Sequence, residues 1–290
     1  MQALVTNQTL QELTDPQRAA LISLLADEDP AIHQLIRDKL LAYGSVAGEW
    51  LRPYLLSSDP VMRRRALEIV HRLGRVNCDE RFLEFCMNHG EDLDLERGMS
   101  LLAQTQYPDM NHAAYVALFD LWSEQLRERL RLVSDGSEIL GILNEFLFQE
   151  LGFRGYESTC QNPENCYLNR VVDRRSGNAI TMCVVYLLLA RRLQLPITGI
   201  GLPGHFVCRF QTSTKECYID VFRQGKLWTK ADCIRHLLST HHGIHDGYLA
   251  PISPRRILLR TCATLHQTYA HLEMTEEAGR VQRYLLALAK

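Results

Sequence analysis

Apolar residues in the first hundred positions recur with the spacing of α-helices, and an Asp-Pro pair opens three of these segments. The pairs are Asp15-Pro16, Asp29-Pro30 and Asp59-Pro60. Aspartate suits the N-cap because its side-chain oxygen accepts a helix N–H, and proline suits the first turn because the N–H that it lacks would have no partner there. The pattern predicts a helix at each pair and a further helix over residues 47–56.

The pattern changes in the second half of the chain. Longer periodicities predict helices over residues 110–132 and 137–151, and a nearly continuous apolar run from 180 to 195 predicts a buried helix. Residues 152–167 are rich in glycine, asparagine and other polar residues, which is typical of a loop. A short helix is expected between this loop and the apolar run.

Beyond Pro196, short segments rich in β-branched and aromatic residues predict strands over ITGIGL, HFVCRFQT and CYIDVF. Helical patterns return at residues 226–241 and in the tail from residue 253, which is broken near residues 273–275. These elements together predict an α+β fold that is mostly helical and contains a small sheet.

Composition narrows the functional classes. The chain has 290 residues, of which 46% are hydrophobic and 23% charged, and its formal net charge is −2. Neither nucleic acid nor an anionic membrane is therefore expected as a partner. No apolar run approaches the roughly 20 residues of a membrane span, and we expect no signal peptide because a basic region followed by an apolar stretch is lacking at the start.

The nine cysteines indicate the compartment. They form no CxxC pair, and most of them lie in apolar periodic segments, where a free cysteine behaves as a small hydrophobic residue. This pattern favours free thiols in a reducing environment over a disulfide framework. We therefore expect a cytoplasmic protein.

Two segments of the helical N-terminal part resemble HEAT-type repeats. They are LLADEDPAIHQLIRDKLL and LLSSDPVMRRRALEIVHRL, and the resemblance extends over roughly residues 10–105. It implies an α-solenoid, whose stacked helix pairs offer a concave surface for partner proteins. One alternative is an ordinary helical bundle in place of a solenoid, and another is a platform that only stabilises the next domain.

Residues 165–229 carry the most specific motifs. The segments NCYLNRVVDRRSGNAITMCVVYLLLARRLQLPITGIGLPGHFVCRF and YIDVFRQGKLWT are similar to the transglutaminase-like superfamily, and within it to the SirB-type branch, which includes bacterial proteins and a eukaryotic F-box protein. The resemblance implies a papain-like core with a central helix against an antiparallel sheet. We expect HEAT-like repeats at 1–108, this core at 109–250 and a tetratricopeptide-like helical hairpin at 251–290.

The resemblance also implies a candidate site. In catalytic members, a cysteine at the start of the central helix is the nucleophile, because a helix N-terminus favours the thiolate and a nearby histidine takes its proton. His205 and Asp220 occupy the histidine and aspartate positions, and we expect their side chains to be in contact. Counting back from Leu195-Pro196 places the nucleophile position at Ala179, so the catalytic cysteine is absent there.

Other residues near the helix start are alternative nucleophiles. Cys183 lies one turn, about 5.4 Å, deeper on the same helical face as Ala179, where apolar surroundings would raise its pKa and keep it inert. Thr181 and Ser176 are weaker candidates because a hydroxyl at a helix start is more often a cap. The candidate binding cleft comprises Asn178, Ala179 and Gly204.

Three functions stay open. The domain is a protein-interaction or adaptor module that lacks the nucleophile, a thiol-dependent hydrolase or acyltransferase with His205 as base, Asp220 as orienting group and Cys183 as nucleophile, or a purely structural scaffold. The missing cysteine favours the first. No cofactor is expected, because no nucleotide-binding motif is present. No metal is expected either, because Cys233-x-x-His236 and the histidines at 241, 242 and 245 lack the spacing of a zinc site.

Overall fold

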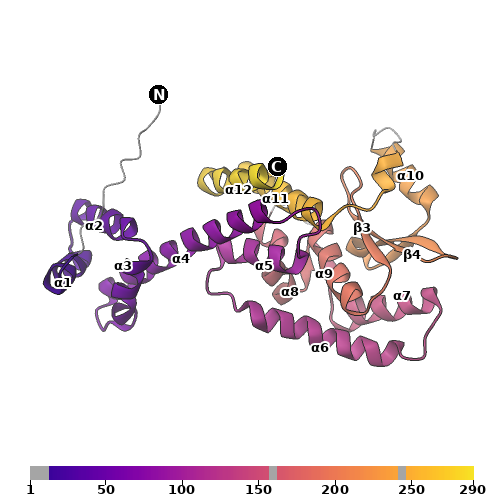
Figure 1. The fold of residues 1–290 in the computed structure, drawn as a ribbon, viewed down its shortest axis with the longest axis horizontal. Helices are drawn as coiled ribbons and strands as arrows, with labels where there is room; N and C mark the ends of the chain where they lie inside the picture. The colour runs from indigo at the N-terminus through magenta and orange to yellow at the C-terminus, as the bar shows by residue number, and fades with distance from the viewer. Residues whose placement is uncertain (1–12, 157–161, 241–245) are drawn as a thin grey trace. The chain divides into compact units, whose positions relative to one another are not determined.

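The computed structural model describes residues 13–156, 162–240 and 246–290 (Figure 1). Backbone contacts divide the chain into two compact units, Met1–Glu80 and Arg81–Lys290, so that the division falls within helix α4 (Pro60–Asn88). The described residues contain no helix long and apolar enough to cross a membrane. The domain boundaries expected after residues 108 and 250 stay predictions.

The first unit is helical in all the elements that the structure describes there. Its apolar stripes meet in one core, which includes the fully buried Leu25, Leu40 and Leu51. Its elements are α1 (Asp15–Ser23), the 3-10 turn η1 (Leu24–Ala26), α2 (Pro30–Ala42), α3 (Ser45–Leu51), the 3-10 helix η2 (Arg52–Leu56) and the first part of α4.

Two of the three Asp-Pro pairs cap helices as predicted. Asp29 accepts the N–H of Ala31, and Asp59 accepts the N–H of Val61, each at 2.8 Å. The first pair differs from the prediction.

Helix α1 begins at Asp15 itself, and Thr14 is its N-cap. The Thr14 N–H donates to the side-chain oxygen of Gln17 at 2.9 Å, so a reciprocal capping pair takes the place of the aspartate cap.

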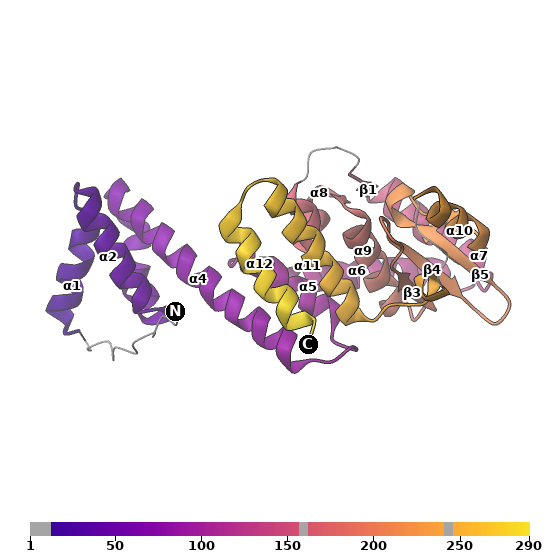
Figure 2. The ribbon, with the colours of Figure 1, turned by 90° about the horizontal axis from the view of Figure 1, so that it is seen from above.

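The second unit contains the mixed α and β elements. Its helices after α4 are α5 (Leu95–Gln106), α6 (His112–Leu130), α7 (Gly136–Asn144), which continues as the π-helical η3 (Glu145–Glu150), η4 (Pro163–Cys166), α8 (Leu168–Arg174), α9 (Ala179–Arg192), η5 (Val221–Arg223), α10 (Lys230–Ser239), η6 (Asp246–Leu249), α11 (Pro254–His271) and α12 (Thr275–Leu288). Helices α11 and α12 lie side by side in both views of the fold (Figures 1 and 2).

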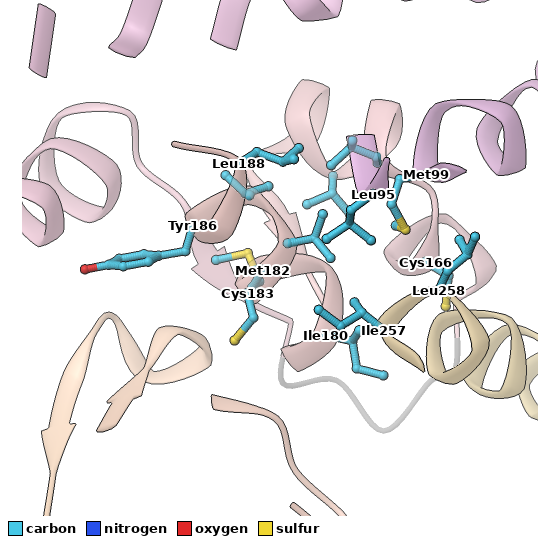
Figure 3. Packing of buried hydrophobic residues seen from close by; sticks show 14 of the residues in the cluster. Leu95, Met99, Cys166, Ile180, Met182, Cys183, Tyr186, Leu188, Ile257 and Leu258 are labelled. Atoms are coloured by element: carbon cyan, nitrogen blue, oxygen red, sulfur yellow. The ribbon is translucent and has the colours of Figure 1, made fainter. Parts of the chain in front are cut away.

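Helix α9 is the centre of this unit. Ten of its fourteen residues are buried, so the helix needs neighbours on every side rather than along one stripe. It contacts α6, α8, α11, η5 and two strands of the sheet. Figure 3 shows Ile180 beside Ile257 of α11, while the Tyr186 ring leaves the helix on the side away from Leu258.

The sheet is antiparallel, as the resemblance implied, with strand order β3-β4-β5-β6. Phe206, Cys208 and Phe210 face the main core around α9, whereas Val207 belongs to a smaller core with residues of α10. Side chains along this segment therefore alternate between the two cores. The strands are β3 (Ile197–Ile200), β4 (Val207–Gln211), β5 (Glu216–Asp220) and β6 (Lys226–Trp228).

Three local predictions are wrong. His205 precedes β4 instead of lying on it, because the turn at Pro203-Gly204 delays the strand. Residues 226–228 form β6 rather than the start of a helix, because they pair with β5. The expected loop after residue 152 contains β1 (Arg154–Gly155), which pairs in parallel with β2 (Ser176–Gly177).

A buried arginine fastens the C-terminal hairpin to the rest of the second unit. The guanidinium of Arg255, at the start of α11, donates to the carbonyls of Cys86 and His89 at 2.8 and 2.7 Å. It also donates to the carbonyls of Ala287 and Leu288 at 2.9 and 3.0 Å. These carbonyls lie at or near the C-terminal ends of two helices, where no helical N–H is available to them.

Replacing Arg255 should therefore destabilise the second unit strongly. We expect Arg255→Met to lower the free energy of unfolding by about 3–5 kcal/mol, because four buried carbonyls lose their donors. The neighbouring Arg256 is exposed, and Arg256→Met should change the stability by less than about 0.5 kcal/mol. Urea denaturation followed by tryptophan fluorescence compares the two variants, and equal effects would contradict the assignment.

Candidate functional site

Asn178 and Thr181 fix the start of helix α9. Asn178 is the N-cap, and its side-chain oxygen accepts the N–H groups of Ile180 and Thr181, each at 3.0 Å. The Thr181 hydroxyl donates to the carbonyl of Asn165 at 2.6 Å. Thr181 is fully buried, and its hydroxyl links the start of α9 to η4.

The other residues proposed near the helix start have separate surroundings. Ser176 is buried in β2 and pairs with Arg154. The amide nitrogen of Asn178 lies 3.2 Å from the sulfur of Cys166, so this side chain is turned towards η4. Ala179 is the first residue of α9 and is partly buried, whereas Gly204 is exposed and has a φ of +70°.

His205 and Asp220 are in contact, as predicted. The Nε2 atom of His205 lies 3.1 Å from an Oδ atom of Asp220, whose side chain is 0% exposed. Neither atom has a hydrogen-bond partner of acceptable geometry among the described residues. The two side chains are therefore in close polar contact without a well-aligned hydrogen bond.

The local backbone holds Asp220 in place. Its other carboxylate oxygen accepts the N–H of Arg223 at 3.2 Å, which caps the short helix η5. The Gly225 N–H donates to the Asp220 carbonyl at 2.9 Å. Gly225 has a φ of +75°, and a Cβ there would come within 2.3 Å of the Asn144 side chain, so the turn requires glycine.

Aromatic rings enclose His205. Its ring centroid lies 5.7 Å from that of Trp228 on β6 and 6.3 Å from that of Phe222 on η5. A second imidazole, that of His236 on α10, lies 5.5 Å away. The sequence indicates His236 only as part of a possible zinc motif. Its spacing of three residues from Cys233 is the local signal that places both residues on one face of α10.

Cys183 lies in the core rather than in an accessible cleft. Its side chain is 0% exposed, and its thiol donates to the carbonyl of Phe206 at a sulfur–oxygen distance of 3.6 Å. Burial raises the pKa of the Cys183 thiol well above its usual value, and the neighbouring Cys208 and the carboxylate of Asp220 act in the same direction. The prediction of a buried, inert thiol at this position agrees with these contacts.

The structure brings no metal-ligating set together within residues 13–156, 162–240 and 246–290, where no group of three His, Cys, Asp or Glu side chains has a suitable arrangement. Cys233 is buried in the small core between the sheet and α10. The ring of His236 lies against that of His205, with 5.5 Å between the ring centroids. The histidines at 241, 242 and 245 lie outside the described residues.

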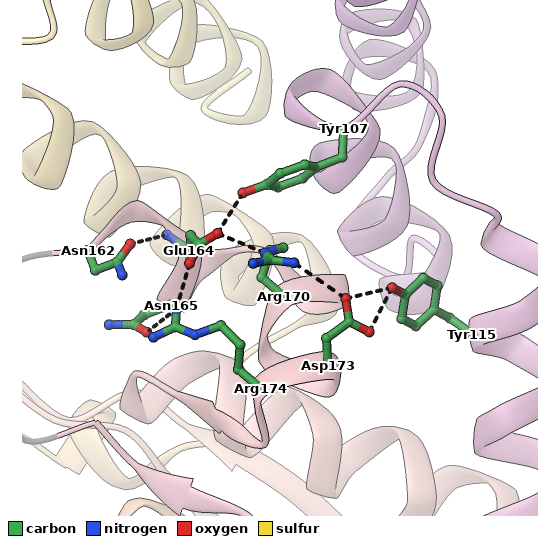
Figure 4. A network of polar contacts seen from close by, with 8 residues as sticks. All are labelled: Tyr107, Tyr115, Asn162, Glu164, Asn165, Arg170, Asp173 and Arg174. Carbon is green, nitrogen blue, oxygen red and sulfur yellow. Dashed lines mark hydrogen bonds and ion pairs between the residues drawn. The ribbon is translucent and has the colours of Figure 1, made fainter.

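A polar network supports the segment that leads into α9 (Figure 4). The carboxylate of Glu164 in η4 accepts from Arg170 at 2.8 Å and from Arg174 at 3.0 Å, which ties η4 to α8. The Tyr107 hydroxyl lies 3.5 Å from the same carboxylate. Burial, with Glu164 beside it, raises the pKa of Tyr107 to about 12, so this phenol stays neutral and donates.

Comparison with known proteins identifies the central part of the chain. A family model described as "Transglutaminase-like superfamily" matches residues 113–263. The chain is 32% identical over 205 residues to a UPF0162 protein of Xylella fastidiosa, which covers 68% of this chain and 73% of that protein. No solved structure matches.

Two further relatives share a shorter region. Human F-box only protein 21 is 32% identical over 158 residues, which is 52% of this chain and 24% of that protein. A UPF0162 protein of Vibrio cholerae is 26% identical over 142 residues, which is 49% of this chain and 50% of that protein.

The role of Thr181 can be tested by removing its hydroxyl. We expect Thr181→Val to lower the free energy of unfolding by about 1–3 kcal/mol, because the Asn165 carbonyl loses its donor in a buried place. Thr198 is exposed on β3, and Thr198→Val should change the stability by at most about 0.5 kcal/mol. Chemical denaturation measures both, and an unchanged Thr181→Val variant would refute the fastening role.

Proposed function

The chain belongs to the transglutaminase-like superfamily, and we propose that it uses the core of this superfamily to bind a protein partner and not as a thiol enzyme. The observation that carries the proposal is the burial of Cys183, the cysteine of α9, whose thiol is covered on all sides. The motifs of residues 165–229 support placing the chain in the SirB-type branch.

A nucleophilic cysteine must form a thiolate that a substrate can reach. Cys183 meets neither condition, because its sulfur faces the Phe206 carbonyl and the negative charge of Asp220 opposes a second negative charge nearby. The position at the N-terminus of α9, where the helix dipole would favour a thiolate, is occupied by Ala179. The side chains at the helix start therefore supply no thiol.

His205 and Asp220 do not by themselves require catalysis. A fully buried carboxylate is costly unless it is paired or hydrogen-bonded, and Asp220 accepts a hydrogen bond from the Arg223 N–H and lies 3.1 Å from the His205 ring. The pair then serves to hold the segment before β4 against the end of β5. The same contact is the observation that favours the alternative function, a thiol-dependent hydrolase or acyltransferase with Cys183 as nucleophile.

The N-terminal helical unit supports the binding role. Several of its large apolar side chains are exposed, among them Leu35 at 68% and Leu56 at 91%. Single exposed apolar residues are normal on protein surfaces, so the proposal rests on the resemblance of residues 10–105 to HEAT-type repeats and not on these side chains alone. We infer that this unit has HEAT-like stacking and presents the partner surface, while the superfamily core supplies the rigid base.

Alkylation of individual cysteines distinguishes the two functions. We expect Cys183 in the folded wild-type protein to react with iodoacetamide no faster than the other buried cysteines, because burial and the nearby Asp220 carboxylate both raise the pKa of its thiol. Mass spectrometry of labelled peptides over a pH series gives the rate at each cysteine. Selective labelling of Cys183 near neutral pH, slowed by His205→Ala, would establish the thiol enzyme instead.

The variant Ala179→Cys is the matched positive control. It places a thiol at the partly buried first residue of α9, where the helix N-terminus lowers a thiol pKa. We expect this cysteine to be labelled faster than Cys183 in the same protein. If neither position is labelled, the cleft is closed to small reagents and the proposed binding role must reside in the N-terminal unit.

A further inference from the structure

Three aromatic rings from different elements meet beside Asp220. The ring of His236 on α10 lies 5.5 Å from that of His205 and 5.6 Å from that of Trp228, and the rings of His205 and Trp228 are 5.7 Å apart. His205 belongs to the segment before β4, and Trp228 belongs to β6. Each ring therefore contacts the other two, and His236 is the contribution of α10 to this cluster.

The environment of His236 favours the neutral ring on balance. Its Nε2 atom is buried and has no hydrogen-bond partner among the described residues. A proton on that atom would create a buried donor without an acceptor, which is unfavourable. It would also place a positive charge beside the imidazole of His205.

The two largest influences on the pKa of His236 act in the same direction. Burial lowers the pKa of His236 from 6.5, His205 and Arg223 lower it further, and the Pro203 carbonyl and Asp220 act in the opposite direction. Further from the ring, the facing strands carry Glu216 on β5 and Lys226 on β6. Their charges act on Cys233 and Asp232 of α10, respectively.

His236 lies where α10 attaches to the sheet. Cys233 and Leu237, its neighbours on α10, pack into the small core with Val207, Tyr218 and Trp228. This core contains few residues compared with the main core around α9. An unfavourable charge in it therefore acts on α10 more than on the rest of the second unit.

We propose that His236 makes the attachment of α10 sensitive to protons: α10 stays packed on the sheet while the His236 ring is neutral, and protonation of that ring releases it. The proposal is independent of whether the cleft binds a partner or a substrate, since it depends only on the ring cluster and the small core.

The lowered pKa of His236 determines how the packing of α10 depends on pH. A released α10 leaves His236 in water, where its pKa returns towards 6.5, whereas packing lowers that pKa. The packed state is therefore fully stable above pH 6.5 and loses stability as the pH falls below this value. Each unit by which packing lowers the pKa corresponds to about a tenfold change in the packing equilibrium at low pH.

Hydrogen exchange measured at pH 7.5 and pH 5.0, corrected for the intrinsic rates, tests the release in the full chain. We expect protection of the peptide covering residues 230–239 to fall several-fold at pH 5.0, up to about tenfold for each unit of pKa lowering. Protection of the peptide covering α11 should stay constant. No change at residues 230–239, or an equal change in both peptides, would overturn the proposal.

Variants of single histidines locate the effect. His236→Phe keeps a ring against Trp228 and removes the proton site, so its α10 peptide should be equally protected at both pH values. His71 is exposed, and His71→Gln should behave as the wild type. A pH response that survives in His236→Phe would assign the sensitivity to another group and refute the proposal.

Nuclear magnetic resonance of 13C-labelled histidine provides the second readout, with the His236 signal assigned from its loss in His236→Phe. We expect the midpoint of His236 protonation to lie below 6.5 in the wild type and to rise in His205→Gln, because the neighbouring imidazole is gone. A wild-type midpoint at or above 6.5 would overturn the proposal even if α10 is released by acid.

Discussion

The burial of α9 is the constraint on which the second unit depends. A helix that is apolar on nearly all sides cannot lie at a surface, so several elements must surround it. The α6, α8 and α11 helices, together with η5, β3 and β4, do so. Because the surroundings are apolar, the polar groups at the start of α9 need internal partners, and Asn178 and Thr181 provide them. The position of the candidate site follows, since α9, β4 and η5 meet there.

The parts of this arrangement that depend on local pattern could be predicted from the sequence. The apolar run of α9 is long enough to exclude a strand, and the alternation around Val207 separates two cores correctly. The three-residue strand β6 could not be predicted, because its residues become a strand only by pairing with β5. The contacts of Arg255 with Cys86 and His89 also have no local signal, since more than 160 positions separate these residues.

In the candidate site too, some features could be predicted from the sequence and others depend on tertiary packing. The contact between His205 and Asp220 was expected from the motifs that contain them, and the structure confirms it at 3.1 Å. The third member of the cluster, His236, was missed because it reaches His205 through the packing of α10 on the sheet. A helical pattern indicates which face of α10 is buried, but the partner of that face depends on the order of the strands.

One turn of helix separates two chemical situations in this protein. At Ala179, a side chain lies at a helix N-terminus, where backbone N–H groups and the dipole stabilise negative charge. At Cys183, the helix N–H groups are already bonded within α9, and the sulfur is fully buried with the carboxylate of Asp220 nearby. The same packing that makes α9 a stable central element thus removes the solvation that a thiolate needs. A cysteine of α9 can be structural or reactive, and its depth in the helix decides which.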